Sequence, residues 1–558
     1  MNPVPGSLDP RAWRSFFRST LWSWRDCPQL RAMDHGAFER YQSESRFVQD
    51  ALAALSSTPR LDQAFLAQIA PALERLLQRM NQFGDDITAF ILFKQAGSLL
   101  EDHGLDEAAA RALQWAGRCG RDLRYYDESQ MLLDRALACA LRVDPHHPHL
   151  IEIYSSIGLL CHFTRRWDEA ESNYRKSLAL LELWPQAEVL RQCRLPKSRI
   201  LGNRLTNLLD LHLVRAQLSP PGGRGPELMA AKSLLERVRG LSADDPIALE
   251  FATADDGEIL LLEGRVGEAG ALLTAHLAHL ALGSPAAPRL IPAVHRLLAM
   301  VCAEEGRIRD AYDHCREALE ESLHRPSVYW EGVVVDTTLD ILSRSIRPRI
   351  TGTGLDALNA DDRQILNNLV LMLERKDWYT GNNHSRAVSR MSRMLGERLL
   401  GDSPSQYGRP GDSPDYLDLQ LLELGGLLHD IGKLRIPWSL LNKSNPLTPI
   451  EHRILESHVS EGGAMLRQLG FVSLARLVEE HHEKLDGSGY PLGRKRLSLM
   501  GAVVAVTDAY EAMVTPNRRY TAPRSRQSAI KELEDCSGRF YHPRVVQALE
   551  DIVAGQPP

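Results

Sequence analysis

The chain has 558 residues, of which 44% are hydrophobic and 25% are charged, a balance that excludes disordered and fibrous proteins. Single hydrophobic cores stop growing at roughly 250 to 300 residues, so two or more domains are expected. The net charge of −6, from 66 basic and 72 acidic residues, provides no global field that would attract a nucleic acid polymer or an acidic membrane. An anionic ligand must therefore be bound by a local site.

Residues 1–100 are predicted to be helical, most clearly over residues 61–80, and are not assigned to any repeat. Arg11, Arg14, Arg18 and Arg25 interrupt the aromatic residues of the first 30 positions, so we find no apolar segment for export. No later run approaches the ~20 apolar residues that a membrane span needs. We therefore expect a cytoplasmic protein with no membrane contact, whose 8 cysteines are reduced thiols.

Residues 101–346 repeat a short helical phrase, in which a small residue is followed at helical spacing by a large apolar residue and another small residue. In one copy these residues are Ala170, Tyr174 and Ser177. The phrase recurs at intervals of about 41 residues, and an amphipathic segment precedes each copy. The pattern resembles tetratricopeptide repeats, with generic helical hairpins as the alternative. The resemblance implies a solenoid of hairpins that acts as a sensory or protein-docking module.

Three stretches rich in proline, glycine and polar residues interrupt the helical pattern. Residues 219–226 are predicted to form a loop within the repeats, residues 347–354 a domain boundary, and residues 401–414 an insertion between two helices. No alternating strand pattern competes with helix over the long segments. The sequence therefore predicts an all-α protein, with a final domain over residues 355–558.

Histidines and aspartates beyond residue 375 lie on or beside apolar helical stretches. They are His384, His429, Asp430, His458, His481, His482 and Asp508. Neutral imidazoles bind borderline transition metals, and a carboxylate can bridge two cations. Two such ions about 3.5 to 4 Å apart can activate water and bind a phosphoryl oxygen. These residue types predict a two-metal site, with Asp430 as the candidate bridge.

These residues, together with the motifs LLHDIGK at 427–433, HHE at 481–483 and DGSGYP at 486–491, resemble the HD-GYP family. The resemblance covers roughly residues 377–549 and predicts a helical bundle that binds iron or manganese. It implies hydrolysis of the bacterial second messenger cyclic di-GMP to the linear dinucleotide pGpG, or onward to GMP.

The resemblance also assigns roles by position. His384, His429, Asp430 and Asp508 would bind the first metal ion, and Asp430, His458, His481 and His482 the second. Lys433 would face the scissile phosphate and stabilise the charge of the transition state. Lys443 and Arg518 would contact phosphates as charged donors. Taken alone, Lys433 could instead be a charge at a helix C-terminus and Arg518 a surface ion-pair partner.

Family members with a third metal ion carry a glutamate where Thr380 stands, so the resemblance predicts two ions and favours the linear dinucleotide as product. Gly489, Tyr490 and Pro491 read alone as a turn. In the family this turn is also implicated in contacts with signalling proteins such as diguanylate cyclases, and both interpretations can hold together.

Two alternatives of other kinds stay open. One is a catalytically silent scaffold that retains the fold as a ligand-responsive interaction module. The other is a metal-dependent hydrolase of another cyclic dinucleotide or of a guanosine polyphosphate. The first would be favoured by loss of the expected ligands, and none of the seven is lost.

Overall fold

The computed structural model describes residues 9–23, 35–58, 61–82, 86–193, 196–241, 246–284, 286–324, 328–346, 358, 360–378, 383–402, 416–443, 446–515 and 523–555. Within these ranges the chain is helical, and the isolated bridge between Ser537 and Tyr541 forms no strand. The predicted all-α class is confirmed. The chain divides into two compact units, the first made of Met1–Arg307 and Glu320–Trp330, the second of Ile308–Leu319 and Glu331–Pro558.

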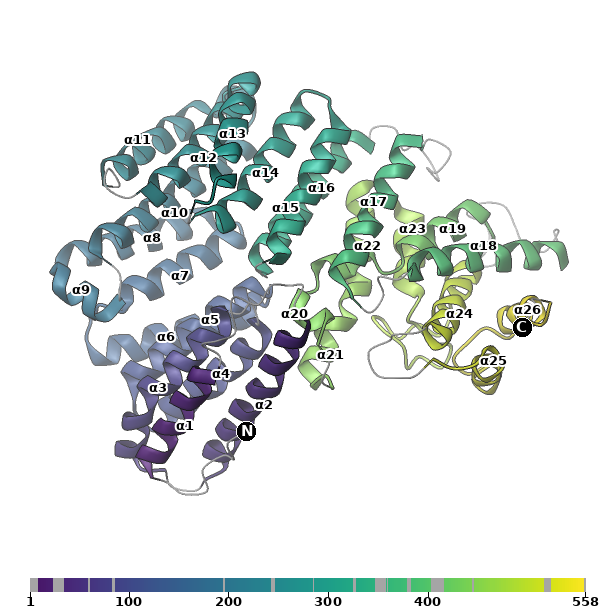
Figure 1. Ribbon diagram of the computed structural model, residues 1–558, viewed down its shortest axis with the longest axis horizontal. Helices are drawn as coiled ribbons and strands as arrows, with labels where there is room; N and C mark the ends of the chain where they lie inside the picture. Colours follow the sequence, from purple (N-terminus) through teal and green to yellow (C-terminus); the bar gives the residue numbers. More distant parts are fainter. Residues whose placement is uncertain are drawn as a thin grey trace. The chain divides into compact units, whose positions relative to one another are not determined.

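The first unit is a succession of helices that pack on their neighbours in the chain as hairpins (Figure 1). Its helices are α1 (Pro10–Ser23), α2 (His35–Ser57), α3 (Gln63–Gln82), α4 (Asp86–Asp102), α5 (Asp106–Asp122), α6 (Tyr126–Val143), α7 (Leu150–Phe163), α8 (Trp167–Leu183), α9 (Gln186–Cys193), α10 (Lys197–Leu218), η1 (Pro221–Gly223), α11 (Gly225–Leu241), α12 (Pro246–Leu262), α13 (Val266–Ala281) and α14 (Ala287–Glu304). Helix α15 (Ile308–His324) contributes residues to both units.

The hairpins close because a glycine on one helix receives a large side chain from the next. A Cβ atom on Gly158 of α7 would lie 2.6 Å from the ring of Tyr174 on α8. A Cβ on Gly117 of α5 would lie 2.6 Å from Leu133 of α6. Tyr174 and Leu133 are fully buried, so the phrase predicted from the sequence marks the contact between paired helices.

The predicted loop at residues 219–226 is shorter than expected. The chain makes the single turn η1 there, and α11 already begins at Gly225. Pro226 follows in the first turn of that helix, where proline is tolerated because its missing N–H would have had no helical partner.

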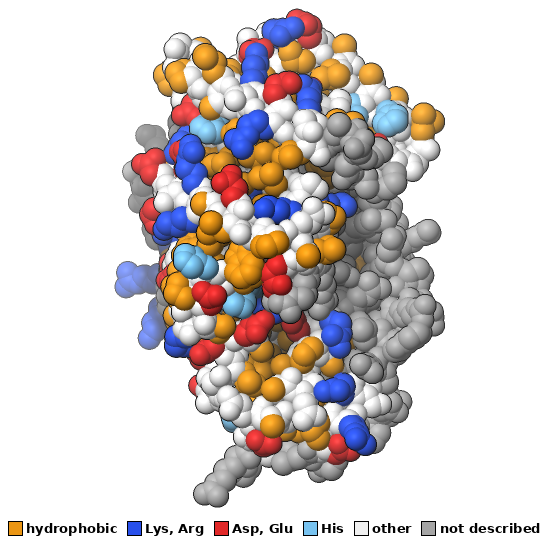
Figure 2. Space-filling view, turned by 90° about the vertical axis from the view of Figure 1, so that its left-hand side faces the viewer, with side chains coloured by type: hydrophobic (Ala, Val, Ile, Leu, Met, Phe, Trp, Pro, Cys, Tyr) orange, Lys and Arg blue, Asp and Glu red, His pale blue; other side chains and the backbone are white. Residues whose placement is uncertain are grey.

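Figure 2 shows the side of the molecule that carries α9. Over the described part of this face, acidic, basic and apolar side chains are intermixed. The face therefore provides no field of a single sign that would select a highly charged partner. None of the described helices has the length and apolar character required to cross a membrane.

The second unit is a helical bundle. Its remaining elements are α16 (Val328–Ile346), α17 (Ala360–Lys376), α18 (His384–Asp402), α19 (Leu419–Leu428), η5 (Ile431–Arg435), α20 (Trp438–Leu441), α21 (Pro449–Glu456), α22 (His458–Leu469), α23 (Val472–Glu480), α24 (Leu499–Val514), α25 (Arg526–Asp535) and α26 (Pro543–Ala554). Of the predicted insertion at residues 401–414, the first two residues complete α18, and the rest lies outside the described residues.

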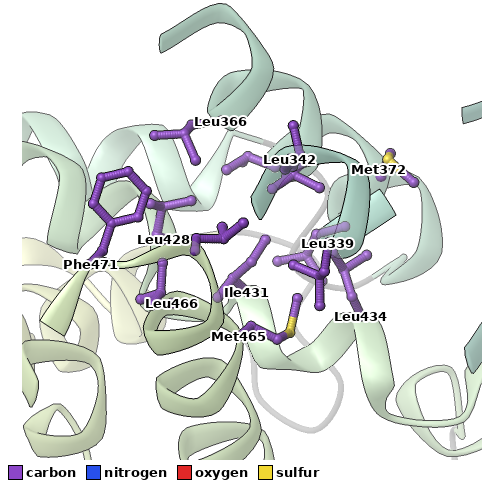
Figure 3. Packing of buried hydrophobic residues seen from close by; sticks show 14 of the residues in the cluster. Leu339, Leu342, Leu366, Met372, Leu428, Ile431, Leu434, Met465, Leu466 and Phe471 are labelled. Carbon is purple, nitrogen blue, oxygen red and sulfur yellow. The ribbon is translucent and has the colours of Figure 1, made fainter. Parts of the chain in front are cut away.

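One core of the second unit joins residues from both sides of the predicted domain boundary. Leu339 and Leu342 of α16 pack with Ile431 and Leu434 of η5 and with Met465 of α22 (Figure 3). The predicted ranges 101–346 and 355–558 place α16 with the repeats, whereas its apolar face belongs to the same core as η5. The compact unit therefore begins earlier than the sequence suggested, since helical periodicity does not reveal which neighbour a face packs against.

Candidate metal centre

His429 and Asp430 lie at the junction of α19 and η5. The His429 ring is fully buried, and its Nδ1 hydrogen-bonds to the carbonyl of Gly426 at 2.8 Å. This bond fixes a proton on Nδ1 and directs Nε2 into the site. Burial opposes a charge on the ring, but Asp430 and Asp508 raise the pKa of His429 to about 10, so the ring must lose its Nε2 proton when it binds a metal ion. Nε2 lies 3.3 Å from Asp430 Oδ2 and 3.6 Å from Asp508 Oδ1.

His458 and His481 repeat this arrangement at two other helix ends. His458 begins α22, and its Nδ1 lies 2.6 Å from the Leu455 carbonyl. His481 follows α23, and its Nδ1 lies 2.5 Å from the Val478 carbonyl. The two Nε2 atoms consequently point at one another across 3.4 Å.

The seven predicted ligands gather into two groups around Asp430. His384, His429 and Asp508 form one group, and His458, His481 and His482 form the other, with one ligand atom of each residue within 4.8 Å of those of its group. Asp430 Oδ2 lies 3.3 Å from His429 Nε2, and Asp430 Oδ1 lies 3.4 Å from His458 Nε2. The carboxylate thus directs one oxygen toward each group.

The imidazoles of the second group are held in the neutral form. Burial lowers the pKa of His458 to about 3, although Asp430 opposes the shift. Burial also lowers the pKa of His481 well below its usual value, and His482 adds to the effect. Neutral rings with Nδ1 protonated present Nε2 lone pairs to each other, which is the form that a transition metal binds.

The carboxylates are held in the charged form. Burial alone would raise the pKa of Asp430, but Lys433 and His429 outweigh it and keep this pKa well below its usual value. Burial likewise opposes the ionisation of Asp508, but a hydrogen bond with His384 and the nearby His429 ring lower its pKa well below the usual value. The buried Asp430, the largely buried Asp508 and the converging imidazole nitrogens are a donor set that fits divalent transition-metal ions.

Lys433 lies on the same turn as the Asp430 carboxylate. Its Nζ is 2.7 Å from Asp430 Oδ2 and 3.5 Å from Asp377 Oδ2. The ammonium is therefore next to the metal site and is shared by two buried carboxylates. Asp377, directly after α17, is a neighbour of the site that sequence reasoning missed.

The other predicted substrate contacts are placed differently. Lys443 Nζ lies 2.6 Å and 2.7 Å from the two carboxylate oxygens of Glu451, so a phosphate would share this ammonium with a buried acid. Its role in substrate binding stays a prediction. Arg518, like Thr380, lies outside the described residues.

The turn at Gly489, Tyr490 and Pro491 packs directly on the second histidine group. The Tyr490 ring stacks on His482 with centroids 4.8 Å apart, and the Tyr490 N–H lies 3.2 Å from the His482 carbonyl. A Cβ on Gly489 would lie 2.5 Å from that same carbonyl oxygen, so only glycine fits. The turn is thus part of the wall of the site.

Two buried glutamates fix the segment that carries this turn, and sequence reasoning missed both as positioning groups. Glu483 accepts hydrogen bonds from the N–H groups of Leu492 and Arg494, both at 2.8 Å. Glu480 accepts one from the Ser498 N–H at 3.0 Å. Glu480 and Glu483 directly flank the predicted ligands His481 and His482 in the sequence, and this position could have indicated their role.

Comparison with known families agrees with this architecture. Residues 406–545 match the model of the HD domain, and the range includes His429, Asp430, His458, His481, His482 and Asp508. The second unit carries an HD domain. Residues 109–182, helices α5 to α8, match the tetratricopeptide repeat, so both resemblances inferred from the sequence are confirmed at this level.

Curated relatives match part of the chain. A cyclic di-GMP phosphodiesterase of Thermotoga maritima is 39% identical over 133 residues, which are 23% of this chain and 36% of that protein. The cyclic di-GMP phosphodiesterase PA4108 of Pseudomonas aeruginosa is 37% identical over 193 residues, 34% of this chain and 42% of that protein. The 3'3'-cGAMP-specific phosphodiesterase 2 of Vibrio cholerae is 29% identical over 198 residues, 34% of this chain and 35% of that protein. The chain spans less than half of the length of each of these relatives.

Proposed function

We propose that the chain is a divalent-metal-dependent phosphodiesterase that hydrolyses cyclic di-GMP to linear pGpG, or onward to GMP. The observation that carries the proposal is the placement of Asp430 between two groups of ligand atoms, one carboxylate oxygen toward each. Relatives named as cyclic di-GMP phosphodiesterases support the choice of substrate.

The seven residues of the two groups and the bridge are the proposed ligands of two ions, iron or manganese. His384, His429 and Asp508 would hold one ion and His458, His481 and His482 the other, with Asp430 shared. Five imidazoles favour a transition metal over magnesium or calcium, which prefer oxygen ligands. Bound here, two such ions would supply Lewis-acid activation of water and of a phosphodiester oxygen.

The protein's own groups would orient the substrate and balance its charge. The Lys433 ammonium, between Asp430 and Asp377, is proposed to donate to the scissile phosphate as negative charge develops on its oxygens. Tyr490, stacked on His482, would exclude bulk water from that side of the site. Lys443 and Arg518 are proposed as additional phosphate contacts.

The partner proteins are proposed by module. The tetratricopeptide repeats would dock a protein partner or sense a signal, because stacked hairpins form extended binding surfaces. The Gly489, Tyr490 and Pro491 turn would contact signalling proteins such as diguanylate cyclases. We place the reaction in the cytoplasm.

The test is turnover of cyclic di-GMP by anaerobically purified full-length protein, with metal counted per chain and products separated by chromatography. His429→Ala and Asp430→Ala should abolish turnover and lower the metal content while the helical circular dichroism signal is retained. His452→Ala is the matched control, since His452 is an exposed histidine of α21 outside both groups. Binding of cyclic di-GMP without turnover, with iron and manganese alike, would establish the silent scaffold instead.

A second candidate is hydrolysis of 3'3'-cGAMP, favoured by the relative from Vibrio cholerae that carries this specificity in its name. The same protein should be assayed with both cyclic dinucleotides. A higher kcat/KM for 3'3'-cGAMP would reassign the substrate and leave the metal chemistry as proposed.

A further inference from the structure

The turn η5, which follows Asp430 and carries Lys433, has an outer side that faces away from the metal site. Arg435 on this side donates from Nη2 to Asp336 Oδ1 of α16 at 2.7 Å and from Nη1 to Glu461 Oε2 of α22 at 2.7 Å. Its side chain is largely buried between them, with 12% exposed. Arg435 therefore ties the turn both to α16 and to the helix that begins with His458.

A second link between α16 and η5 passes through a buried lysine. Lys376, the last residue of α17, is fully buried, and its Nζ lies 2.7 Å from Glu331 Oε2 of α16. The same Nζ donates to the Leu434 carbonyl of η5 at 2.6 Å. Asp377 follows directly and lies 3.5 Å from the Lys433 ammonium.

Apolar packing completes the contact. Leu339 and Leu342 of α16 belong to the same buried cluster as Ile431 and Leu434 of η5, and Figure 3 shows these side chains directed toward one another. Along the turn, Asp430 and Lys433 face the metal site, whereas Ile431, Leu434 and Arg435 face α16 and its neighbours. One helix thus supports the back of the turn that carries the bridge and the proposed phosphate donor.

We propose that Glu331 and Asp336 of α16 are positioning residues for the reaction proposed above, on which this inference rests. Glu331 acts through Lys376 and Asp336 through Arg435, and together they fix η5 so that Lys433 faces the substrate phosphate. Both residues precede the segment that matches the HD domain, residues 406–545. The catalytic geometry therefore depends on a helix outside that domain.

The test compares Asp336→Asn and Glu331→Gln with the wild-type protein, using full-length, metal-loaded samples well below their unfolding midpoints. Removing either charge should lower kcat about tenfold, as loss of an outer-shell partner does, while KM and metal content stay unchanged. Asp336→Glu should recover most of the lost kcat, because it restores the carboxylate toward Arg435. A merely structural role would lower the apparent kcat only in proportion to the folded, metal-loaded fraction, so kcat per folded molecule, corrected by circular dichroism and metal content, would equal that of the wild type.

Asp340→Asn is the matched control. Asp340 is on the same helix, its side chain is 49% exposed like that of Asp336, and it pairs with Arg344 one turn further along the helix. Unchanged kcat in both test variants, or a loss equal to that of Asp340→Asn, would overturn the inference while the proposed function stands. A wild-type protein that binds its metals and hydrolyses no cyclic dinucleotide would overturn both. If Glu331→Gln does not fold, the Asp336 series alone decides.

Discussion

The α-carbon of Gly432 packs against the backbone carbonyl of His458, so closely that a Cβ at this position would overlap the carbonyl oxygen. Gly432 lies between Asp430 and Lys433 on η5, and His458 begins α22. The separation between the carboxylate and this imidazole is therefore set by backbone contact.

Gly432→Ala should push η5 away from α22 and separate Asp430 from His458. We expect metal content to fall by at least half and turnover by more than tenfold, with a loss of stability of about 1–3 kcal/mol from overpacking. Metal analysis and thermal unfolding are the measurements. Gly401→Ala is the control, because a Cβ at Gly401 of α18 would meet nothing within 4 Å; equal behaviour of the two variants would refute the argument.

Removal of metal should destabilise the second unit as well as stop the reaction. Because Nδ1 of each ring is bonded to a backbone carbonyl, the Nε2 atoms of His458 and His481 direct lone pairs at each other across 3.4 Å, and a bound cation would relieve their repulsion. Chelation should lower the thermal midpoint by roughly 5–10 °C, the shift expected when a ligand present at about 100 times its Kd is withdrawn. Manganese or ferrous iron should restore both midpoint and turnover, and recovery with magnesium alone would contradict the proposed donor set.

Lys433 should be needed for the chemical step and not for metal binding. Lys433→Met is expected to lower kcat by about 10²–10³ while metal content is retained, because a charged donor to the developing negative charge is lost. Lys433→Arg should retain part of the activity. The control is Lys531→Met, an exposed lysine of α25; loss of metal in Lys433→Met would instead indicate that the lysine acts by holding Asp430 in place.

A fragment of residues 355–558 should be much less stable than one of residues 308–558. The shorter fragment lacks α16, which exposes the apolar side of η5 and leaves the buried Lys376 without Glu331. Breaking a buried ion pair in this way costs about 3–5 kcal/mol. We expect the midpoint to fall by roughly 10 °C and the fragment to aggregate in gel filtration. Equal midpoints would show that α16 is dispensable to the core.

The sequence pointed to the candidate metal site because the residues that form it are of unusual types in unusual combinations. His429 beside Asp430, and His481 beside His482, cannot be explained by helical periodicity, so they pointed to chemistry before any geometry was known. The hairpins could be predicted for a similar reason, since a glycine and a large side chain that packs on it recur at the same spacing, as in Gly117 with Leu133 and Gly158 with Tyr174.

The residues that hold the site in place could not be predicted from the sequence, because their role depends on tertiary contacts. Lys376 in the last turn of α17 reads as an ordinary charge at a helix C-terminus, and only the fold buries it against Glu331. Asp336 reads as a surface acid of a repeat helix. Neither local pattern nor charge could show that both carboxylates lie behind the turn that carries Lys433.

Helix α15 gives its residues Ile308–Leu319 to one compact unit and its remainder to the other. The repeat helices consequently cannot be exchanged as a block that ends with α15 or α16. A chimera that joins this hydrolase to a foreign sensor must therefore keep α15 and α16 with the catalytic bundle. A junction placed after α16, near residue 355, would separate side chains that belong to one folded core.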